Sequence, residues 1–322
     1  MEILALGLAL LAVALAVPVP MLLHEAPARA RSPWVWMVLW QAIALSGGLS
    51  MVGSPIIYGL SPFGSSFPEA VGTAVELTTA EDYEALAAMD VHPWHIFALC
   101  LGLVLGAHLL LTLARTFYRV RRARARHRQM VQLLSTPLRS PSFGEMTSVP
   151  DFDAQVIEHD APLAYCLPGR TNAGSVTVLS RGLLDQLTDA ELAAVVAHER
   201  THLRQRHHLL TMAFEAWYRA LPWLPTTRYG REAVLELTEM LADDGALAEH
   251  GSDVLLRSIA TTSTSGDGTR ADLQPGDSGL ITGIRLQRLL TRPRPLAWPA
   301  SAGLLAVSAL LLVGPTTLIL VS

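Results

Sequence analysis

Long apolar segments dominate the pattern of hydrophobic and polar positions along this chain. A helix needs about 20 mainly apolar residues to cross about 30 Å of hydrocarbon. Four runs approach or exceed that length, and none has Arg, Asp or Glu in its interior: residues 3–23, 34–60, 94–113 and 298–321. We therefore predict four transmembrane helices, in preference to helices buried in the core of a soluble protein.

The composition agrees with membrane helices. Hydrophobic residues make up 51% of the chain and charged residues 16%, whereas a soluble domain carries about 25% charged residues. The first run has Ala28-Arg-Ala30 after it, which resembles a signal-peptidase site, but it begins with Glu2 and lacks a basic residue. It is also longer than the roughly 7–15 apolar residues of a signal peptide, so we interpret it as a retained span.

Arginine is distributed unevenly between the segments that flank the spans. The loop after the first span holds Arg29 and Arg31, and seven Arg follow the third span between residues 115 and 128. The loop of residues 61–92 holds six acidic residues and no Arg. The positive-inside rule then predicts a multi-pass plasma-membrane protein with both termini outside the cell and residues 116–297 in the cytoplasm.

These patterns predict three parts of the chain. Residues 1–115 form three transmembrane helices, residues 116–297 a cytoplasmic domain, and residues 298–322 the fourth transmembrane helix and the C-terminus. The Arg cluster after the third span is expected to contact lipid head groups. The net charge of −4 does not favour direct nucleic-acid binding.

The cytoplasmic segment mixes short strands and helices. Short strands are predicted at 154–158 and 163–166, and the alternating, β-branched residues of 175–180 predict a third strand, which forms a hairpin with 163–166. Further elements are a short helix at 181–187, a capped helix from 190 to about 213 or beyond, helices at 231–248 and 280–290, and a loop at 261–279. Residues 208–224 are unusually apolar, which suits either the membrane interface or an ordinary core.

The sequence His198-Glu199-Arg-Thr-His202 lies within the capped helix, which a Thr188–Glu191 capping box can begin. Residues four apart share one helix face, so both histidines can bind one metal ion. Glu199 lies about 100° round the helix, within reach of a water molecule on that metal. The pattern predicts a catalytic zinc site rather than a solvated helix face.

A catalytic zinc site needs three protein ligands and one open position. The helix at 231–248 offers five acidic candidates: Glu232, Glu236, Glu239, Asp243 and Asp244. Glu239 is preferred as the third ligand because Asp243 follows one turn later and can orient a ligating histidine. Asp244 is the alternative in that orienting role. Another divalent ion is not excluded, because several metals accept this ligand set.

The predicted reaction is peptide hydrolysis, with Glu199 as general base towards a zinc-activated water. A second group that stabilises the oxyanion is not identified; the candidates are His207, His208, Tyr218 and His250. The strand at 175–180 is expected to hold an extended substrate by edge pairing. Cys100 and Cys166 are too few for a disulfide framework, and Cys166 is interpreted as a buried strand residue rather than a thiolate ligand.

Several segments together resemble the BlaR/MecR antirepressor family of membrane metallopeptidases. They are Tyr165–Gly169, Val176–Leu184, Leu187–Leu192, Val196–Arg204 and Glu239–Asp244. More distantly, they are similar to the HtpX and CaaX-type membrane zinc proteases. The resemblance implies an α-helical membrane protein with a cytoplasmic α+β gluzincin-like zinc peptidase domain. It also implies zinc on His198, His202 and Glu239, and cleavage of a cytoplasmic repressor protein.

The chain departs from β-lactam receptors of that family, which carry a penicillin-binding domain after the fourth span. All 24 basic residues are Arg, so an S-x-x-K motif is absent and direct acylation sensing is not expected. The leading hypothesis is a membrane zinc endopeptidase that cleaves a transcriptional repressor. The alternatives are an HtpX-like quality-control protease and a signalling receptor with a non-catalytic structural metal site; the oligomeric state is left open.

Overall fold

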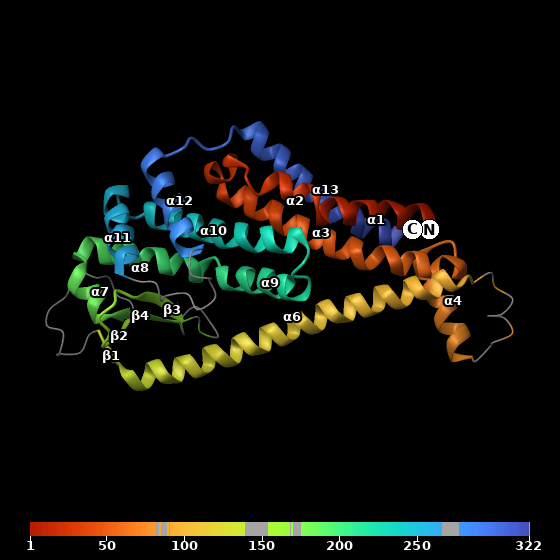
Figure 1. The fold of residues 1–322 in the computed structure, drawn as a ribbon, viewed down its shortest axis with the longest axis horizontal. Helices are drawn as coiled ribbons and strands as arrows, with labels where there is room; N and C mark the ends of the chain where they lie inside the picture. The colour runs from red at the N-terminus through yellow and green to blue at the C-terminus, as the bar shows by residue number, and fades with distance from the viewer. Residues whose placement is uncertain are drawn as a thin grey trace. The chain divides into compact units, whose positions relative to one another are not determined.

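The protein is described here by a computed structural model of residues 1–80, 84, 89, 91–138, 154–167, 169, 175–265 and 277–321. It is mostly helical, with several long apolar helices and one small sheet (Figure 1). The chain divides into two compact units. Unit 1 comprises Met1–Thr116, Ala213–Val234 and Leu296–Ser322, and unit 2 comprises Phe117–Met212 and Leu235–Pro295.

Four helical segments of the described chain are long and apolar enough to cross a membrane. They are α1 (Glu2–Ala16) with α2 (Pro18–Leu23), α3 (Pro33–Leu60), α6 (Pro93–Leu134) and α13 (Trp298–Val321). The four predicted apolar helices are therefore confirmed, whereas their orientation in a membrane stays a prediction. Helix α6 extends beyond the third apolar run and continues unbroken through the Arg-rich segment.

Helix α3 is the centre of unit 1, where it packs against both α1 and α13 (Figure 1). The Ser54 hydroxyl on α3 donates a hydrogen bond to the carbonyl of Ala5 on α1, 2.8 Å away. Pro18 begins α2 and separates it from α1, since its ring cannot continue the helical hydrogen bonding. The acidic loop contains the helix α4 (Phe67–Thr79), and short 3-10 helices occupy Pro27–Arg31 and Ser61–Phe63.

The sheet of unit 2 has the strand order β1-β2-β4-β3. Its strands are β1 (Ser135–Pro137), β2 (Ala154–Ile157), β3 (Ala164–Leu167) and β4 (Val176–Ser180). The predicted hairpin is confirmed, because β3 and β4 pair antiparallel. The predicted edge role of residues 175–180 is wrong: β2 pairs parallel to β4 on its other side, so β4 is internal and β3 is the edge of the described sheet.

The helices of unit 2 correct two predicted boundaries. After α7 (Arg181–Gln186), α8 (Asp189–Arg204) begins at the predicted capping box, which is confirmed. It does not reach residue 213, because Arg206 adopts a left-handed φ of 51° and a new helix, α9 (His207–Ala220), starts there. Helix α10 (Pro225–Leu247) begins six residues before the predicted start at 231.

Two more helices, α11 (Ser252–Ser265) and α12 (Asp277–Thr291), follow α10. The loop predicted at 261–279 is wrong at both ends, where residues 261–265 and 277–279 are helical. The rest of that predicted loop lies outside the described residues. Amphipathic helices at both sites explain the error, because a Ser- and Thr-rich composition does not prevent a helix whose apolar face is buried.

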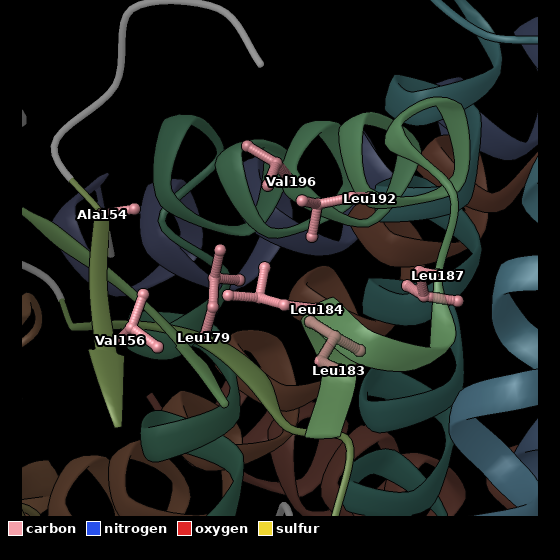
Figure 2. Packing of buried hydrophobic residues seen from close by; sticks show 8 residues of the cluster. All are labelled: Ala154, Val156, Leu179, Leu183, Leu184, Leu187, Leu192 and Val196. Carbon is pink, nitrogen blue, oxygen red and sulfur yellow. The ribbon is translucent and has the colours of Figure 1, made fainter. Parts of the chain in front are cut away.

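Helix α8 is buried on two opposite faces. On one face, Leu192 and Val196 pack against the sheet in a cluster with Val156 and Leu179 (Figure 2). The other face presents the small residues Ala194 and Ala197 to α10, α11 and α12; that cluster comprises Ala194, Ala197, Ala246, Leu255, Ile259 and Leu289. This double burial fixes α8 rigidly between the sheet and the helices.

The close approach of α10 to α8 depends on a glycine. A β-carbon at Gly245 would overlap the side chain of Thr201, which is fully buried on α8. Only glycine allows the two helices to come this near without moving one of them. Gly245 lies two residues from Asp243, so this close approach helps to set the distance between the acidic residues of α10 and the histidines of α8.

Candidate metal centre

Two helices bring three potential metal ligands together. His198 and His202 come from α8 and Glu239 from α10, and one donor atom of each lies within 4.8 Å of the others. The two Nε2 atoms are 3.2 Å apart. Glu239 Oε1 lies 3.2 Å from His202 Nε2, and Glu239 Oε2 lies 3.6 Å from His198 Nε2.

The chemistry of this donor set fits a zinc ion. All three side chains are largely removed from solvent, with 8%, 16% and 3% exposed for His198, His202 and Glu239. Imidazole nitrogens and a carboxylate oxygen are ligand types that zinc accepts. Two histidines and one carboxylate, with a fourth position left for water, are typical of catalytic zinc sites.

The other ring nitrogen of His198 faces Asp243. Asp243 Oδ1 lies 3.0 Å from His198 Nδ1, and the Asp243 side chain is 1% exposed. A carboxylate at this nitrogen favours the proton on Nδ1, which leaves the Nε2 lone pair directed to a metal. The alternative residue, Asp244, binds Arg288 of α12 instead, with Nη2 to Oδ1 at 2.7 Å.

The other ring nitrogen of His202 faces a further histidine that the sequence analysis did not place there. His207 Nδ1 lies 2.9 Å from His202 Nδ1, and His207 Nε2 lies 2.9 Å from the side-chain oxygen of Gln205. An amide oxygen only accepts, so His207 carries its proton on Nε2. His207 Nδ1 then accepts from His202 Nδ1, which leaves the His202 Nε2 lone pair available to a metal.

Arg285 of α12 is the second residue that sequence reasoning missed. Its Nη2 and Nε atoms donate to the two carboxylate oxygens of Asp243 at 2.6 and 2.9 Å. Its Nη1 lies 3.1 Å from Glu239 Oε2. One guanidinium therefore holds the ligand Glu239 and the orienting Asp243 at the same time, in the fork geometry that suits arginine.

These contacts shift the titration of the buried groups. Burial and Arg285 both lower the pKa of His198, but hydrogen bonds to Asp243 and Glu239 outweigh them and raise it to about 9. Burial alone would raise the pKa of Asp243, yet Arg285 and His198 hold it below its usual value. Burial opposes the charge of Arg285, but its carboxylate partners raise its pKa, so it stays a cation.

Glu199 and Cys166 lie close enough to affect each other. Burial raises the pKa of the Cys166 thiol to about 12, and the negative charge of Glu199 adds to that shift. Cys166 is therefore a neutral thiol at physiological pH, as expected for a structural strand residue, and its Sγ lies 3.2 Å from Thr177 Oγ1. Helix α8, which carries Glu199, packs against the edge strand β3.

The structure does not bring the remaining candidates to the metal group. Among the described residues, the group contains neither Glu232 nor Glu236. Burial, with Arg124 and Arg206, lowers the pKa of His208 to about 4, so this residue is neutral. Tyr218 belongs to unit 1, and His250 is not a member of the metal group found among the residues that the structure describes.

Comparison with known proteins supports a peptidase in this part of the chain. Residues 121–224 match Peptidase family M48, which includes the BlaR and HtpX proteins. The match covers the sheet and the two histidines of α8, and it supports a metallopeptidase. No solved structure matches the chain.

Proposed function

We propose that this protein is a membrane-bound zinc metalloendopeptidase. The observation that carries the proposal is the convergence of His198, His202 and Glu239 next to Glu199, within and just beyond a segment that matches a metallopeptidase family. A purely structural metal site would close the fourth ligand position and need no general base. The presence of Glu199 therefore favours catalysis over a signalling receptor with a structural metal.

Zinc on these ligands would lower the pKa of a water molecule and stabilise negative charge on the carbonyl oxygen of the scissile peptide. Glu199 takes the proton of that water as the oxygen attacks the carbonyl carbon. It then delivers the proton to the departing amine nitrogen as the peptide bond breaks. Asp243, His207 and Arg285 contact the three ligands and act as positioning residues, which fix the ring tautomers and the carboxylate.

The edge strand β3 is the proposed substrate platform, in place of β4. A substrate in extended conformation can add a strand to a sheet edge through main-chain hydrogen bonds. Within the described sheet, β3 pairs only with β4, so its outer edge is available to such a strand. Helix α8, which carries Glu199, packs against β3, and this packing supports β3 as the strand nearest the proposed general base.

The resemblance of the sequence to BlaR/MecR proteins favours a cytoplasmic repressor as the substrate. In this proposal four helices cross the plasma membrane, and the Arg-rich segment after the third span faces the cytoplasm together with the peptidase domain. An HtpX-like role in membrane-protein quality control uses the same chemistry. Proteomics of a deletion strain separates them, since one accumulating DNA-binding protein favours the first role and many misassembled membrane proteins favour the second.

The catalytic assignment is tested with the purified full-length protein in lipid nanodiscs. Replacement of the general base, Glu199→Gln, is expected to lower hydrolysis of an unfolded protein substrate by about 10²–10⁴-fold, while bound zinc is retained. The matched control is Glu249→Gln, which changes an exposed glutamate outside the site. Undiminished proteolysis by the Glu199→Gln protein would show that the assignment is wrong.

A further inference from the structure

The segment between the two metal-binding helices forms a helical hairpin that belongs to unit 1. This hairpin, residues 213–234, consists of the end of α9, a short turn and the start of α10. Its tip, residues 220–227, reads Ala-Leu-Pro-Trp-Leu-Pro-Thr-Thr and contains no charged residue. Arg219 and Arg228 stand immediately on either side of the tip.

The tip packs against the interior of three predicted spans. Its apolar residues form one cluster with residues of α1, α3 and α6: Ala220, Leu221 and Leu224 with Ala16, Met51, Leu105 and Leu109. Leu109 and Leu105 lie four and eight residues before the predicted end of the third span at Leu113. At the helical rise per residue, the contacts lie about 6–12 Å inside that span.

The base of the hairpin lies at the end of a span. The ring of Tyr229 stacks on His24, with centroids 4.2 Å apart, and His24 directly follows the first apolar run. The guanidinium of Arg228 lies over the Tyr229 ring, 4.6 Å from its centroid. Basic and aromatic residues therefore gather where the spans end, as they do in the head-group region of a bilayer.

Side chains of the protein donate hydrogen bonds to three carbonyl groups of the tip. Helix α9 ends at Ala220, and His108 Nε2 on α6 donates to its carbonyl oxygen at 3.1 Å. The Thr227 hydroxyl donates to the carbonyl oxygens of Leu221 and Leu224, at 2.7 and 2.8 Å. Pro222 and Pro225 have no N–H to satisfy. Internal partners for carbonyl groups at a helix end are required in hydrocarbon and optional in water.

Trp223 is the exception to the burial of the tip. Its side chain is 74% exposed, although its neighbours Leu221 and Leu224 are only 6% exposed. In water an exposed indole at the apex of an apolar turn is unfavourable, whereas acyl chains and the interface accommodate it. The exposed Trp223 and the contacts of the tip with three predicted spans both indicate a lipid environment.

We propose that residues 213–234 form a re-entrant hairpin that enters the bilayer from the face at which the first span ends. Trp223 contacts lipid acyl chains, and Arg219 and Arg228 lie among the phosphate head groups. The proposal rests on the membrane location in the proposed function. The hairpin joins α9 to α10, so it anchors the helix that carries Glu239 to the lipid.

Depth measurements with nitroxide labels test the hairpin. Single-cysteine proteins are made in a Cys100→Ser, Cys166→Ala background and reconstituted into nanodiscs. The tip variant is Trp223→Cys; Val104→Cys, 67% exposed on α6, is the lipid control, and Glu249→Cys, an exposed polar position, is the water control. Collisions with oxygen and with a nickel chelate report lipid and water, respectively.

The label at Trp223 is expected to match the one at Val104, with high oxygen and low nickel accessibility. Nickel accessibility at Trp223 equal to that at Glu249, with Val104 still protected, would overturn the hairpin and leave the membrane location intact. Nickel access at both Trp223 and Val104 would overturn the membrane location as well. Trp223 is exposed and lies outside the metal group, so its replacement is expected to leave folding and zinc content unchanged.

Discussion

The metal group of unit 2 and the hairpin tip of unit 1 both bury polar atoms, but they do so in opposite ways. At the tip, each buried carbonyl described above meets a donor, such as His108 for Ala220 and Thr227 for Leu221. In the metal group, atoms that can each act as an acceptor converge: two Nε2 atoms lie 3.2 Å apart, with a carboxylate oxygen 3.2 Å from one of them.

This difference distinguishes a structural polar cluster from a binding site. A donor matched to an acceptor is complete and needs no further partner. Acceptors that converge are stabilised when a cation, either a metal or a proton, lies between them; Arg285 adds positive charge from one side of the group. The burial of polar atoms alone therefore does not identify the metal site of this protein. The convergence of atoms that can all act as acceptors does.

The largest expected effect is the pH dependence of zinc affinity, because a proton competes with the metal for this group. In the metal-free protein the pKa of His198 is about 9, so a proton occupies the group at neutral pH and zinc must displace it. Apparent zinc affinity is expected to rise about tenfold per pH unit from pH 7 towards pH 9. Competition titrations with a chromophoric chelator measure it, after correction for chelator protonation. A flat profile would mean that no proton competes with the metal.

The same proton stabilises the metal-free fold. Because the folded-state pKa of His198 lies above the unfolded value of about 6.5, its contribution is complete below pH 6.5 and is lost as pH rises through 9. The metal-free protein is therefore expected to lose stability between these values, and the zinc-bound protein to lose less. Thermal melts of both forms at each pH provide the measurement.

Removal of an orienting partner should weaken the metal site without unfolding it. His207→Phe deletes the acceptor of His202 Nδ1, and zinc affinity is expected to fall about 10–100-fold. His250→Phe, at a histidine outside the metal group, is the control. Unchanged zinc affinity in the His207→Phe protein would show that the His202 tautomer does not depend on this contact.

The next largest effect is expected where α8 and α10 approach each other closely. Gly245→Ala adds a β-carbon that overlaps Thr201, and we expect a loss of about 1–3 kcal/mol in stability with weaker zinc binding. Gly283→Ala is the matched control, since its β-carbon meets no atom within 4 Å and alanine is the better helix former. Chemical denaturation compares the two; equal stability would argue against tight packing at Gly245.

The smallest effect is expected at the tip. Thr227→Val keeps the shape of the side chain but removes the donor to Leu221 and Leu224, at a cost of about 0.5–1.5 kcal/mol. Zinc affinity should not change, because the tip carries no metal ligand. A loss of zinc from this variant would contradict the separation between structural and metal-binding polar clusters.

Local spacing explains what the sequence could predict. The i, i+4 spacing places His198 and His202 on one helix face, and the same spacing relates Glu239 to Asp243. Arg285 could not be found in this way, because it lies 42 residues from Asp243 and only the packing of α12 brings it there. The internal position of β4 likewise depends on its parallel pairing with β2, which no local pattern reveals.

Two further features, the early end of α8 and the surroundings of residues 208–224, could not be predicted from the sequence pattern. The helix of His198 ends early because Arg206 adopts a left-handed conformation, for which arginine gives no signal. The apolar residues 208–224 fit lipid and protein core equally well by composition. The structure adds that Ala220, Leu221 and Leu224 contact residues of α1, α3 and α6, and these contacts support the proposed hairpin.

X-ray absorption at the zinc edge of the purified protein tests the central claim most directly. The account predicts a first shell of nitrogen and oxygen at about 2.0–2.2 Å with the scattering of two imidazoles, and loss of bound zinc in a Glu239→Ala protein. A sulfur scatterer at about 2.3 Å, or full zinc occupancy without Glu239, would contradict the ligand set of His198, His202 and Glu239.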